Sequence, residues 1–384
     1  MSAASHARPG DAWGPLAPQH RSSGIYLAVL LGTLSLAGIL IARPALAQEP
    51  APVLTINEDC TAFAFGPGES IVYSVRHAFG EMGYDDVERD DFWLHEPGKK
   101  DRRVLNGQRF FVTGQVFSYV VRGIRWSPDG TRLAAQLFTT TVLDRRGNTK
   151  DQSMAMLFEP DGREIKLPGS GNLVPDAVNA VWLGDGSTLA FLVEEDKTLH
   201  QFGIDVVRFP SGGGQRLYPD SHFLAVAWLD RASQAVAVIA DPQFAGKPRL
   251  VFLDISAQEM RQLTPLDGFS GGLSLSPSGK LVGYFRDPEH FEVRALDSVQ
   301  RPRTSKLLMG AYLWSPDEQS ILLKSAPARK SGSIQWIRLA DGDSRDLFHG
   351  LTVHDAAISP DGRFLGILLP GKRTLNVYPL ATMH

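Results

Sequence analysis

Histidine, aspartate, asparagine and arginine side chains stand at matching places ahead of a segment that the chain repeats. Each copy of the segment is aligned on one bulky apolar residue, Trp126 in the clearest case. Three, four or six positions before that residue, the copies carry Asp59, Arg122, Asp176, Asn179, His222, His354 and Asp355. Imidazoles and carboxylates are common metal ligands, and paired carboxylates can act as general acid and base. If the copies surround one axis, these side chains converge on one mouth of a central funnel as a candidate ligand-binding set.

The same residues admit a second interpretation, a hydrated polar channel whose hydrogen bonds are satisfied. Metal binding and acid–base chemistry need a defined geometry between side chains from separate loops, and a sequence does not supply it. His222, His354, Asp176 and Asp355 are the set that would support a metal-dependent enzyme, such as a lyase, or a carbohydrate-binding protein. We therefore assign neither a metal nor a cofactor to the sequence.

Sequence signatures of other catalytic classes are lacking. The chain has no H-E-x-x-H, Walker A or dinucleotide-binding fingerprint. Residues 268–272 match G-x-S-x-G, but the segment behind them is strand-like, whereas a nucleophile elbow requires a helix there. We interpret them as a connection between strands. The single cysteine, Cys60, cannot form an internal disulfide and lies in an apolar stretch, so we expect it to be a small buried hydrophobic side chain.

The repeated segment indicates which elements position these residues. Its clearest form is Ile-Arg-Trp-Ser-Pro-Asp-Gly at residues 124–130, with close copies at 274–279, 313–318 and 357–362. The aligned apolar residues, including three looser copies, are Phe65, Trp126, Trp182, Trp228, Leu275, Trp314 and Ile358. They recur at intervals of 39 to 61 residues, which suits units of four short strands.

Each copy predicts a strand, a tight turn and a second strand. Proline fixes φ in the turn, aspartate bonds to nearby backbone, and glycine adopts a positive φ. A third strand is expected at residues 92–94, 155–158, 204–207, 250–253, 293–296, 334–337 and 375–378. A fourth, outer strand follows most of them, as at residues 260–264.

Sheets of this kind bury both faces only when they pack around a common axis. The expected fold class is therefore all-β: a seven-bladed β-propeller of four-stranded antiparallel blades over residues 48–384. The last unit ends after its third strand, near Tyr378. We predict that residues 52–56 supply its fourth strand and close the ring, because closure replaces an open strand edge with a paired one.

The W-S-P-D-G-x-x-L-A pattern at residues 126–134 resembles the WD40-like (PD40) β-propeller repeats of the TolB family. It is also similar to repeats in the propeller domains of prolyl-oligopeptidase-type peptidases. The resemblance extends from about residue 61 to residue 378. TolB-type proteins carry an α/β domain ahead of the propeller and the peptidases carry a hydrolase domain, whereas this chain has no sequence left for either. The resemblance implies a stand-alone propeller, with a role in envelope assembly implied by analogy.

The first 47 residues predict an export signal. Residues 24–41 are apolar and uncharged, Arg21 precedes them, and Ala-Leu-Ala follows at residues 45–47. A basic flank, an apolar core and a small-residue site are the parts of a secretory signal, although the apolar run is also long enough to span a bilayer. Residues 1–47 are thus expected to form a signal peptide or an N-terminal membrane anchor helix, and the remainder to be periplasmic or otherwise extracytoplasmic.

The sequence favours a binding protein over an enzyme. The net charge is −3 and no basic stripe is present, which argues against a nucleic-acid partner. We expect a monomer that binds a protein or peptide, with the funnel-based enzyme or carbohydrate-binding protein as the alternative. The acidic insertion at residues 81–91 is expected to be a loop, either solvated or in contact with a partner.

Overall fold

The computed structural model describes residues 50–81, 84–107, 117–142, 149–167, 173–184, 186–196, 201–240, 247–297, 301–324, 334–348, 353–369 and 374–383. All of them belong to one compact unit, Glu49–His384. They form β-strands and short 3-10 turns, which confirms the all-β prediction. Among these residues no helix is long and apolar enough to cross a membrane. The predicted signal or anchor segment at residues 1–47 lies outside them.

Strands that follow one another along the chain pair in antiparallel sheets. Five sheets have four strands each. Their strands are β2 (Cys60–Phe65), β3 (Ile71–Glu81), β4 (Tyr84–His95) and β5 (Arg102–Leu105); β6 (Phe117–Trp126), β7 (Leu133–Val142), β8 (Thr149–Phe158) and β9 (Leu173–Pro175); β18 (Gly271–Leu275), β19 (Leu281–Asp287), β20 (His290–Ala295) and β21 (Arg303–Lys306); β22 (Ala311–Trp314), β23 (Ser320–Lys324), β24 (Ile334–Arg338) and β25 (Ser344–Phe348); and β26 (Asp355–Ile358), β27 (Phe364–Leu368) and β28 (Leu375–Pro379) with β1 (Leu54–Ile56).

The sixth sheet has eight strands in two groups of four. They are β10 (Val178–Leu183), β11 (Thr188–Asp196), β12 (Gln201–Arg208) and β13 (Gly214–Leu217), and β14 (Phe223–Leu229), β15 (Gln234–Ala240), β16 (Pro248–Asp254) and β17 (Glu259–Pro265). A single residue pair, Phe202 with Phe223, joins the two groups. The short turn η3 (Asp230–Ala232) lies between β14 and β15.

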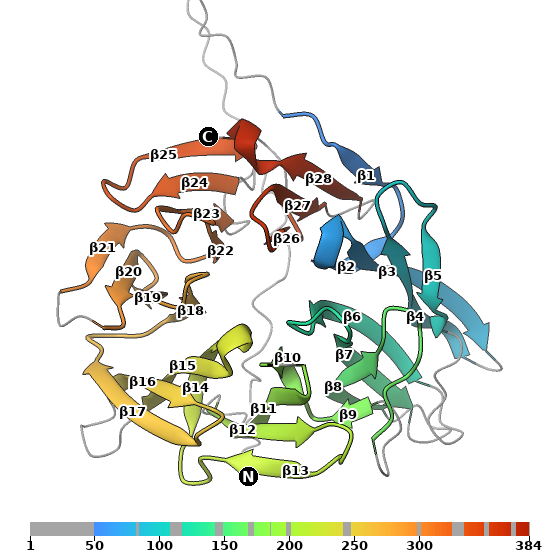
Figure 1. The fold of residues 1–384 in the computed structure, drawn as a ribbon, viewed down its shortest axis with the longest axis horizontal. Coiled ribbons are helices and arrows are strands. Elements are labelled where there is room, and N and C mark those ends of the chain that lie inside the picture. The colour runs from blue at the N-terminus through green and yellow to red at the C-terminus, as the bar shows by residue number, and fades with distance from the viewer. Residues whose placement is uncertain are drawn as a thin grey trace, which may run out of the picture. The chain divides into compact units, whose positions relative to one another are not determined.

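These groups of four strands stand around a central axis as the blades of a propeller (Figure 1). We call the strand of each group that lies nearest the axis its inner strand; the inner strands are β2, β6, β10, β14, β18, β22 and β26. The seven aligned apolar residues of the repeat fall at or next to the last residue of these strands. The prediction that the motif ends a first strand is thus confirmed.

The hydrophobic core lies between the blades rather than within one of them. One cluster joins Phe92 of β4 to Leu133 of β7, and another joins Val377 of β28 to Tyr73 of β3. In the second cluster, Ile56 of β1 is also buried, and β1 pairs with β28 through Leu54 opposite Val377. Both faces of a blade therefore bury apolar surface only when its two neighbours are present.

The Ser-Pro-Asp-Gly turns are built alike. In the turn after β6, Ser127 Oγ donates to Asp129 at 2.5 Å and accepts from the backbone N–H of Arg132 at 2.8 Å. Gly130 has a φ of 72° and its N–H donates to the Ser127 carbonyl at 2.9 Å. The same bonds recur around Ser315 and Ser359. The serine and aspartate thus satisfy the backbone that reverses the chain between the first and second strands.

Turns of neighbouring blades touch one another. A Cβ built on the glycine of a turn would lie within 2.6 Å of a side chain of the preceding blade: Gly130 faces Pro67, Gly279 faces Leu229 and Gly362 faces Pro316. Arg363 follows the turn after β26, and Glu69 lies in the turn after β2. Their side chains form an ion pair at 2.5 Å. Glycine is therefore required in these turns both by the positive φ and by the close approach of the preceding blade.

Several inner strands contain a β-bulge, near the start of most of them and in the middle of β6. In β6, Val121 pairs with Leu137 and Gly123 pairs with Gln136, so Arg122 is an extra residue without an opposite partner. Bulges of the same kind interrupt β2, β10, β14 and β18. A bulge bends a strand and redirects the side chain of the extra residue.

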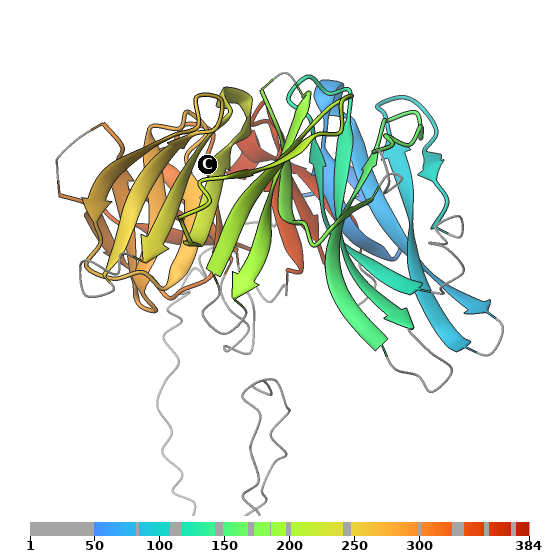
Figure 2. The same ribbon diagram turned by 90° about the horizontal axis from the view of Figure 1, so that it is seen from below.

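The expectation of a loop over residues 81–91 is wrong. β3 ends at Glu81 and β4 begins at Tyr84, so the segment belongs to a long hairpin. Together with β6, β7 and β8, these strands have 10 to 12 residues and extend beyond the other blades on one side (Figure 2). Asp90 and Asp91 are buried. The Asp90 carboxylate accepts a hydrogen bond from the Val121 N–H of β6, and the Asp91 carboxylate accepts one from the Gly107 N–H, just after β5.

Candidate functional site

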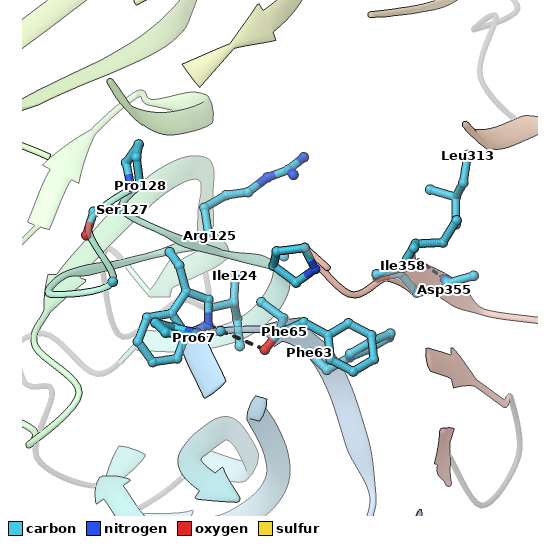
Figure 3. A pocket seen from close by; sticks show the side chains of 18 of the residues that line it. Phe63, Phe65, Pro67, Ile124, Arg125, Ser127, Pro128, Leu313, Asp355 and Ile358 are labelled. Carbon is cyan, nitrogen blue, oxygen red and sulfur yellow. Dashed lines mark hydrogen bonds between the residues drawn. The ribbon is translucent and has the colours of Figure 1, made fainter. Parts of the chain in front are cut away.

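A cavity of about 580 Å³ lies on the axis side of β2, β6 and β26 and reaches the Ser-Pro-Asp-Gly turns (Figure 3). Its apolar wall includes Phe63, Ile124 and Ile358, with Leu313 of β22 on the far side. A second space, of about 720 Å³, is lined mainly by the turns after β14, β18, β22 and β26 and shares Arg231, Ile358 and Pro360 with the first. The inner strands and their turns thus enclose a central space that is part apolar and part polar.

Three arginines and one aspartate supply the charge among the residues that line this cavity. Arg122 and Arg125 come from β6, Arg231 comes from η3, and Asp355 begins β26. We call Arg122, Arg125 and Arg231 the cavity arginines. Three cations against one carboxylate give the lining a positive balance, although the whole chain has a net charge of −3.

Arg122 and Arg125 are held differently. The guanidinium of Arg122, at the β6 bulge, lies 5.7 Å from the centre of the Phe138 ring, a distance typical of a cation–π contact. Figure 3 shows the Arg125 side chain extending from β6 into the space that separates it from Leu313 and Asp355. Arg125 is exposed, so a ligand in the cavity has direct access to its guanidinium.

Asp355 is half-buried at the wall opposite Arg125. Burial raises the pKa of its carboxyl above the ordinary value, while the N–H of Ala356 at 2.8 Å and the charge of Lys324 oppose that shift. Burial also lowers the pKa of Lys324, whose Nζ donates to the carbonyl of His354 at 2.5 Å. Lys324 therefore supports the start of β26 from the neighbouring blade.

The structure brings together two of the side chains that the sequence singled out for the funnel. Arg122 and Asp355 line the same cavity, and His354 precedes Asp355. The remaining four, Asp59, Asp176, Asn179 and His222, are not among the described lining residues of that cavity.

These four residues have other settings. Asp59 is exposed between β1 and β2. Asp176 and Asn179 adopt left-handed backbone conformations, with φ of 55° and 50°, at the entry to β10. His222 is exposed and its Nδ1 lies 2.8 Å from Glu195 Oε2.

The candidate metal ligands named from the sequence are not grouped in the structure. Within the residues that the structure describes, no three or more His, Cys, Asp and Glu side chains are grouped so that they could hold a metal ion. His222, His354, Asp176 and Asp355 all lie in that part of the chain. They therefore do not form the cluster that this alternative requires.

The two candidate nucleophiles, Ser270 and Cys60, lie where a structural role explains them. Ser270 precedes β18 in the connection from β17, and a strand follows it, as the sequence predicted. Cys60 is fully buried, and burial with the nearby charges of Glu58 and Asp59 raises the pKa of its thiol to about 12. Such a thiol stays protonated at neutral pH, which agrees with a packing role.

Sequence reasoning missed Arg125 and Arg231, although the repeat contains a signal for both. Arg125 directly precedes the aligned residue, where the other copies have only uncharged residues: Ala64, Val181, Ala227, Ser274, Leu313 and Ala357. Arg231 occupies the place of the turn aspartate in Asp129, Asp317 and Asp361. Departures from the repeat would have pointed to the cavity more directly than the residues ahead of it.

Comparison with known proteins identifies the fold. A scan against protein-family models finds no match, and neither does a search of curated protein sequences. Among solved structures, a chain of the mitotic checkpoint complex has a TM-score of 0.53 at 11% identity, covering 91% of this chain and 99% of that one. The Dos1 propeller has a TM-score of 0.52 at 13% identity, with coverages of 86% and 95%. The C-terminal WD40 domain of Sif2 has a TM-score of 0.52 at 16% identity, with coverages of 87% and 85%. The chain thus has a WD40-like β-propeller fold.

Proposed function

We propose that the protein is a non-catalytic β-propeller whose central cavity binds a segment of a protein or peptide partner. The cavity itself carries this proposal, because it places apolar and charged side chains around one space at the axis. Its size lies within the range of about 300–1,000 Å³ that is typical of ligand pockets. Propellers of the WD40-like kind commonly mediate protein interactions, which supports a protein or peptide as the occupant.

We further propose that the ring has seven blades and is of the TolB type. The count takes the eight-stranded sheet as two blades, because one residue pair alone joins its halves. The pairing of β1 with β28 supports closure of the ring by residues 52–56. The Ser-Pro-Asp-Gly turns support the TolB-type assignment, since the turn-forming residues are the most regular part of the repeat.

We also propose that the protein is exported and acts in the periplasm or another extracytoplasmic space as a monomer. The support for export is the apolar run at residues 24–41 followed by Ala-Leu-Ala at residues 45–47. A role in envelope assembly is proposed by analogy with TolB-type proteins, which the repeat resembles. Cell fractionation with an antibody against the propeller tests this part, and recovery of the protein in the cytoplasm would contradict it.

The binding function is tested by capture on a protein whose cavity mouth is blocked. Pro360 is exposed in a turn that lines the cavity, so Pro360→Trp places a large ring at the mouth. Arg345→Trp is the matched control, because Arg345 is exposed on the outer strand β25. We expect a protein from envelope extracts to be retained by the wild type and the control and to be lost with Pro360→Trp.

Equal retention by both variants, with unchanged thermal unfolding, would rule out the cavity as the binding site. Retention of a glycan in place of a protein would favour the carbohydrate-binding alternative.

A further inference from the structure

The chemistry of the cavity is set by residues that depart from the repeat. A propeller blade does not need an arginine before its aligned apolar residue, since the other copies fold with alanine, valine, serine or leucine there. Arg125 is exposed and turned into the cavity, so it adds no buried contact to the blade. Local departures of this kind are expected where function, rather than folding, selects the residue.

Arg231 is a second departure from the repeat, at a different position and in another blade. In the turns after β6, β22 and β26, the corresponding aspartate receives a serine hydroxyl hydrogen bond that builds the turn. The turn η3 has Arg231 at this place, and Arg231 lines both the axial cavity and the adjoining space. A structural carboxylate of the repeat is thus replaced by a cation at the axis.

Arg122 is placed by a third device, the bulge in β6. As the extra residue it has no opposite partner in β7, and the face of Phe138 supports its guanidinium. Bulges next to functional sites commonly serve to redirect one side chain. Three cations from two blades are therefore directed at one space by three unrelated local features.

We infer that the cavity binds an acidic peptide segment, whose carboxylates pair with Arg122, Arg125 and Arg231. This inference rests on the proposed function, because it assigns a chemical class to the partner of the same cavity. Guanidinium groups bind carboxylates through two parallel hydrogen bonds, which gives geometric selectivity as well as attraction. The apolar wall formed by Phe63, Ile124 and Ile358 would contact the backbone and the methylene groups of the segment.

Asp355 disfavours the same ligand, so its substitution should change the affinity in the direction opposite to that of an arginine substitution. Its carboxylate lines the cavity across from Arg125, so it repels a bound carboxylate and competes for the arginine. Neutralising it should tighten the binding of an acidic peptide, whereas neutralising an arginine should weaken it. Opposite effects from two residues of one cavity cannot arise from a general loss of folding.

The experiment measures fluorescence anisotropy of labelled decaglutamate, decaglutamine and decalysine with the purified protein. We expect decaglutamate to bind in a salt-sensitive manner and the other two to bind at least tenfold more weakly. Arg125→Ala and Arg231→Ala should each weaken decaglutamate binding at least tenfold, and Asp355→Asn should strengthen it. Arg345→Ala, on the outer strand β25, is the control and should leave binding unchanged.

The inference is overturned if the wild type does not bind decaglutamate, or if Arg345→Ala weakens binding as much as Arg125→Ala does. A second result would also overturn it. That result is equal retention of the partner captured in the blocking experiment by the wild type and by the double variant Arg125→Ala, Arg231→Ala. In that last case the proposed function stands, because loss of the partner with Pro360→Trp would still locate its binding in the cavity. Failure of the proposed function shows itself instead as retention by Pro360→Trp.

Discussion

Asp90 links the first two blades through buried hydrogen bonds. Its Oδ2 accepts from the backbone N–H of Val121 at 2.9 Å and from the hydroxyl of Thr61, and its carbonyl accepts from Tyr119 at 2.8 Å. The side chain is fully buried. Its Oδ1 lies 3.8 Å from Arg76 Nε of β3. These contacts tie the Asp90 carboxylate to β6 and to its own blade, so this residue fixes the position of β4 against β6.

Replacing Asp90 with alanine should destabilise the protein strongly. The variant leaves the Val121 N–H and the Thr61 hydroxyl without this acceptor in the core, for which we expect a loss of about 3–5 kcal/mol in the free energy of unfolding. Denaturant unfolding measures it. The control is Asp151→Ala, which removes an exposed hydrogen bond to Thr140 and should cost less than about 1 kcal/mol. Similar losses for both variants would contradict the account.

The turn aspartates predict how stability depends on acid. Burial disfavours their charge, but hydrogen bonds from Ser127 and Thr131 to Asp129, and from Ser359 and Arg363 to Asp361, lower both pKa values below 3.8. The stabilisation is therefore present above about pH 4 and is lost as the pH falls through the lowered values. Thermal unfolding of the wild type should lose its advantage over the Asp129→Asn, Asp361→Asn variant below that pH. A constant difference down to pH 2 would show that the carboxylates do not contribute in this way.

The acidic segment of the first blade and Arg125 were both misjudged from the sequence. The acidic run that ends in Asp90 and Asp91 suggests a solvated loop, because charges are usually exposed. Its hydrogen-bond partners, Thr61 and Val121, lie about thirty residues away on either side, and no local pattern marks them. Arg125 was overlooked because its position, rather than its residue type, is unusual.

At the scale of the element, turns and bulges differ in how far the sequence specifies them. The Ser-Pro-Asp-Gly turns were predictable because each residue acts on backbone within five residues of itself. The bulges of the inner strands were not predictable, since they are defined by pairing across the sheet. Each bulge shifts the residues ahead of it by one place. The described pairing of β26 with β27 has no such shift, and there counting back from the aligned residue reached Asp355, which lines the cavity. In β2 and β10, where a bulge intervenes, counting back reached Asp59 and Asp176, which are not among the described lining residues.

Contacts between turns predict an unequal response to one substitution. Gly362 and Gly342 have φ of 73° and 75°, so alanine causes similar backbone strain at both. A Cβ at Gly362 would lie 2.6 Å from Pro316 of the preceding blade, whereas nothing lies within 4 Å at Gly342. Gly362→Ala should therefore lower the free energy of unfolding by about 1–3 kcal/mol more than Gly342→Ala does. Equal effects, measured by denaturant unfolding, would mean that the turns tolerate separation of the blades.

At the scale of the molecule, the first and last strands belong to one blade. β1 pairs with β28, Ile56 packs with Leu375 and Val377, and Arg363 pairs with Glu69 beside the first turn. Since each blade buries its faces against its neighbours, opening the ring at this blade exposes apolar surface on two blades at once. The regular repeat made this arrangement predictable, whereas the use of the central space depends on irregular residues.

Removal of β1 should weaken the whole ring. A chain that begins at Asn57 lacks β1, whereas a chain that begins at Pro52 retains it. Loss of the buried Ile56 side chain and of the pairing to β28 should lower the free energy of unfolding by about 3 kcal/mol or more. Differential scanning calorimetry should give a lower Tm for the shorter chain alone. Equal Tm values would show that β1 does not close the ring.

The most direct test of the central claim places a photo-activatable crosslinker at the cavity mouth. Pro360→p-benzoylphenylalanine carries it in a turn that lines the cavity, and Arg345→p-benzoylphenylalanine carries it on the outer strand β25. Irradiation of cells that produce each variant should yield a discrete protein adduct from position 360 and none from position 345. The same adducts from both positions, or an adduct from position 345 alone, would contradict binding of a partner in the central cavity.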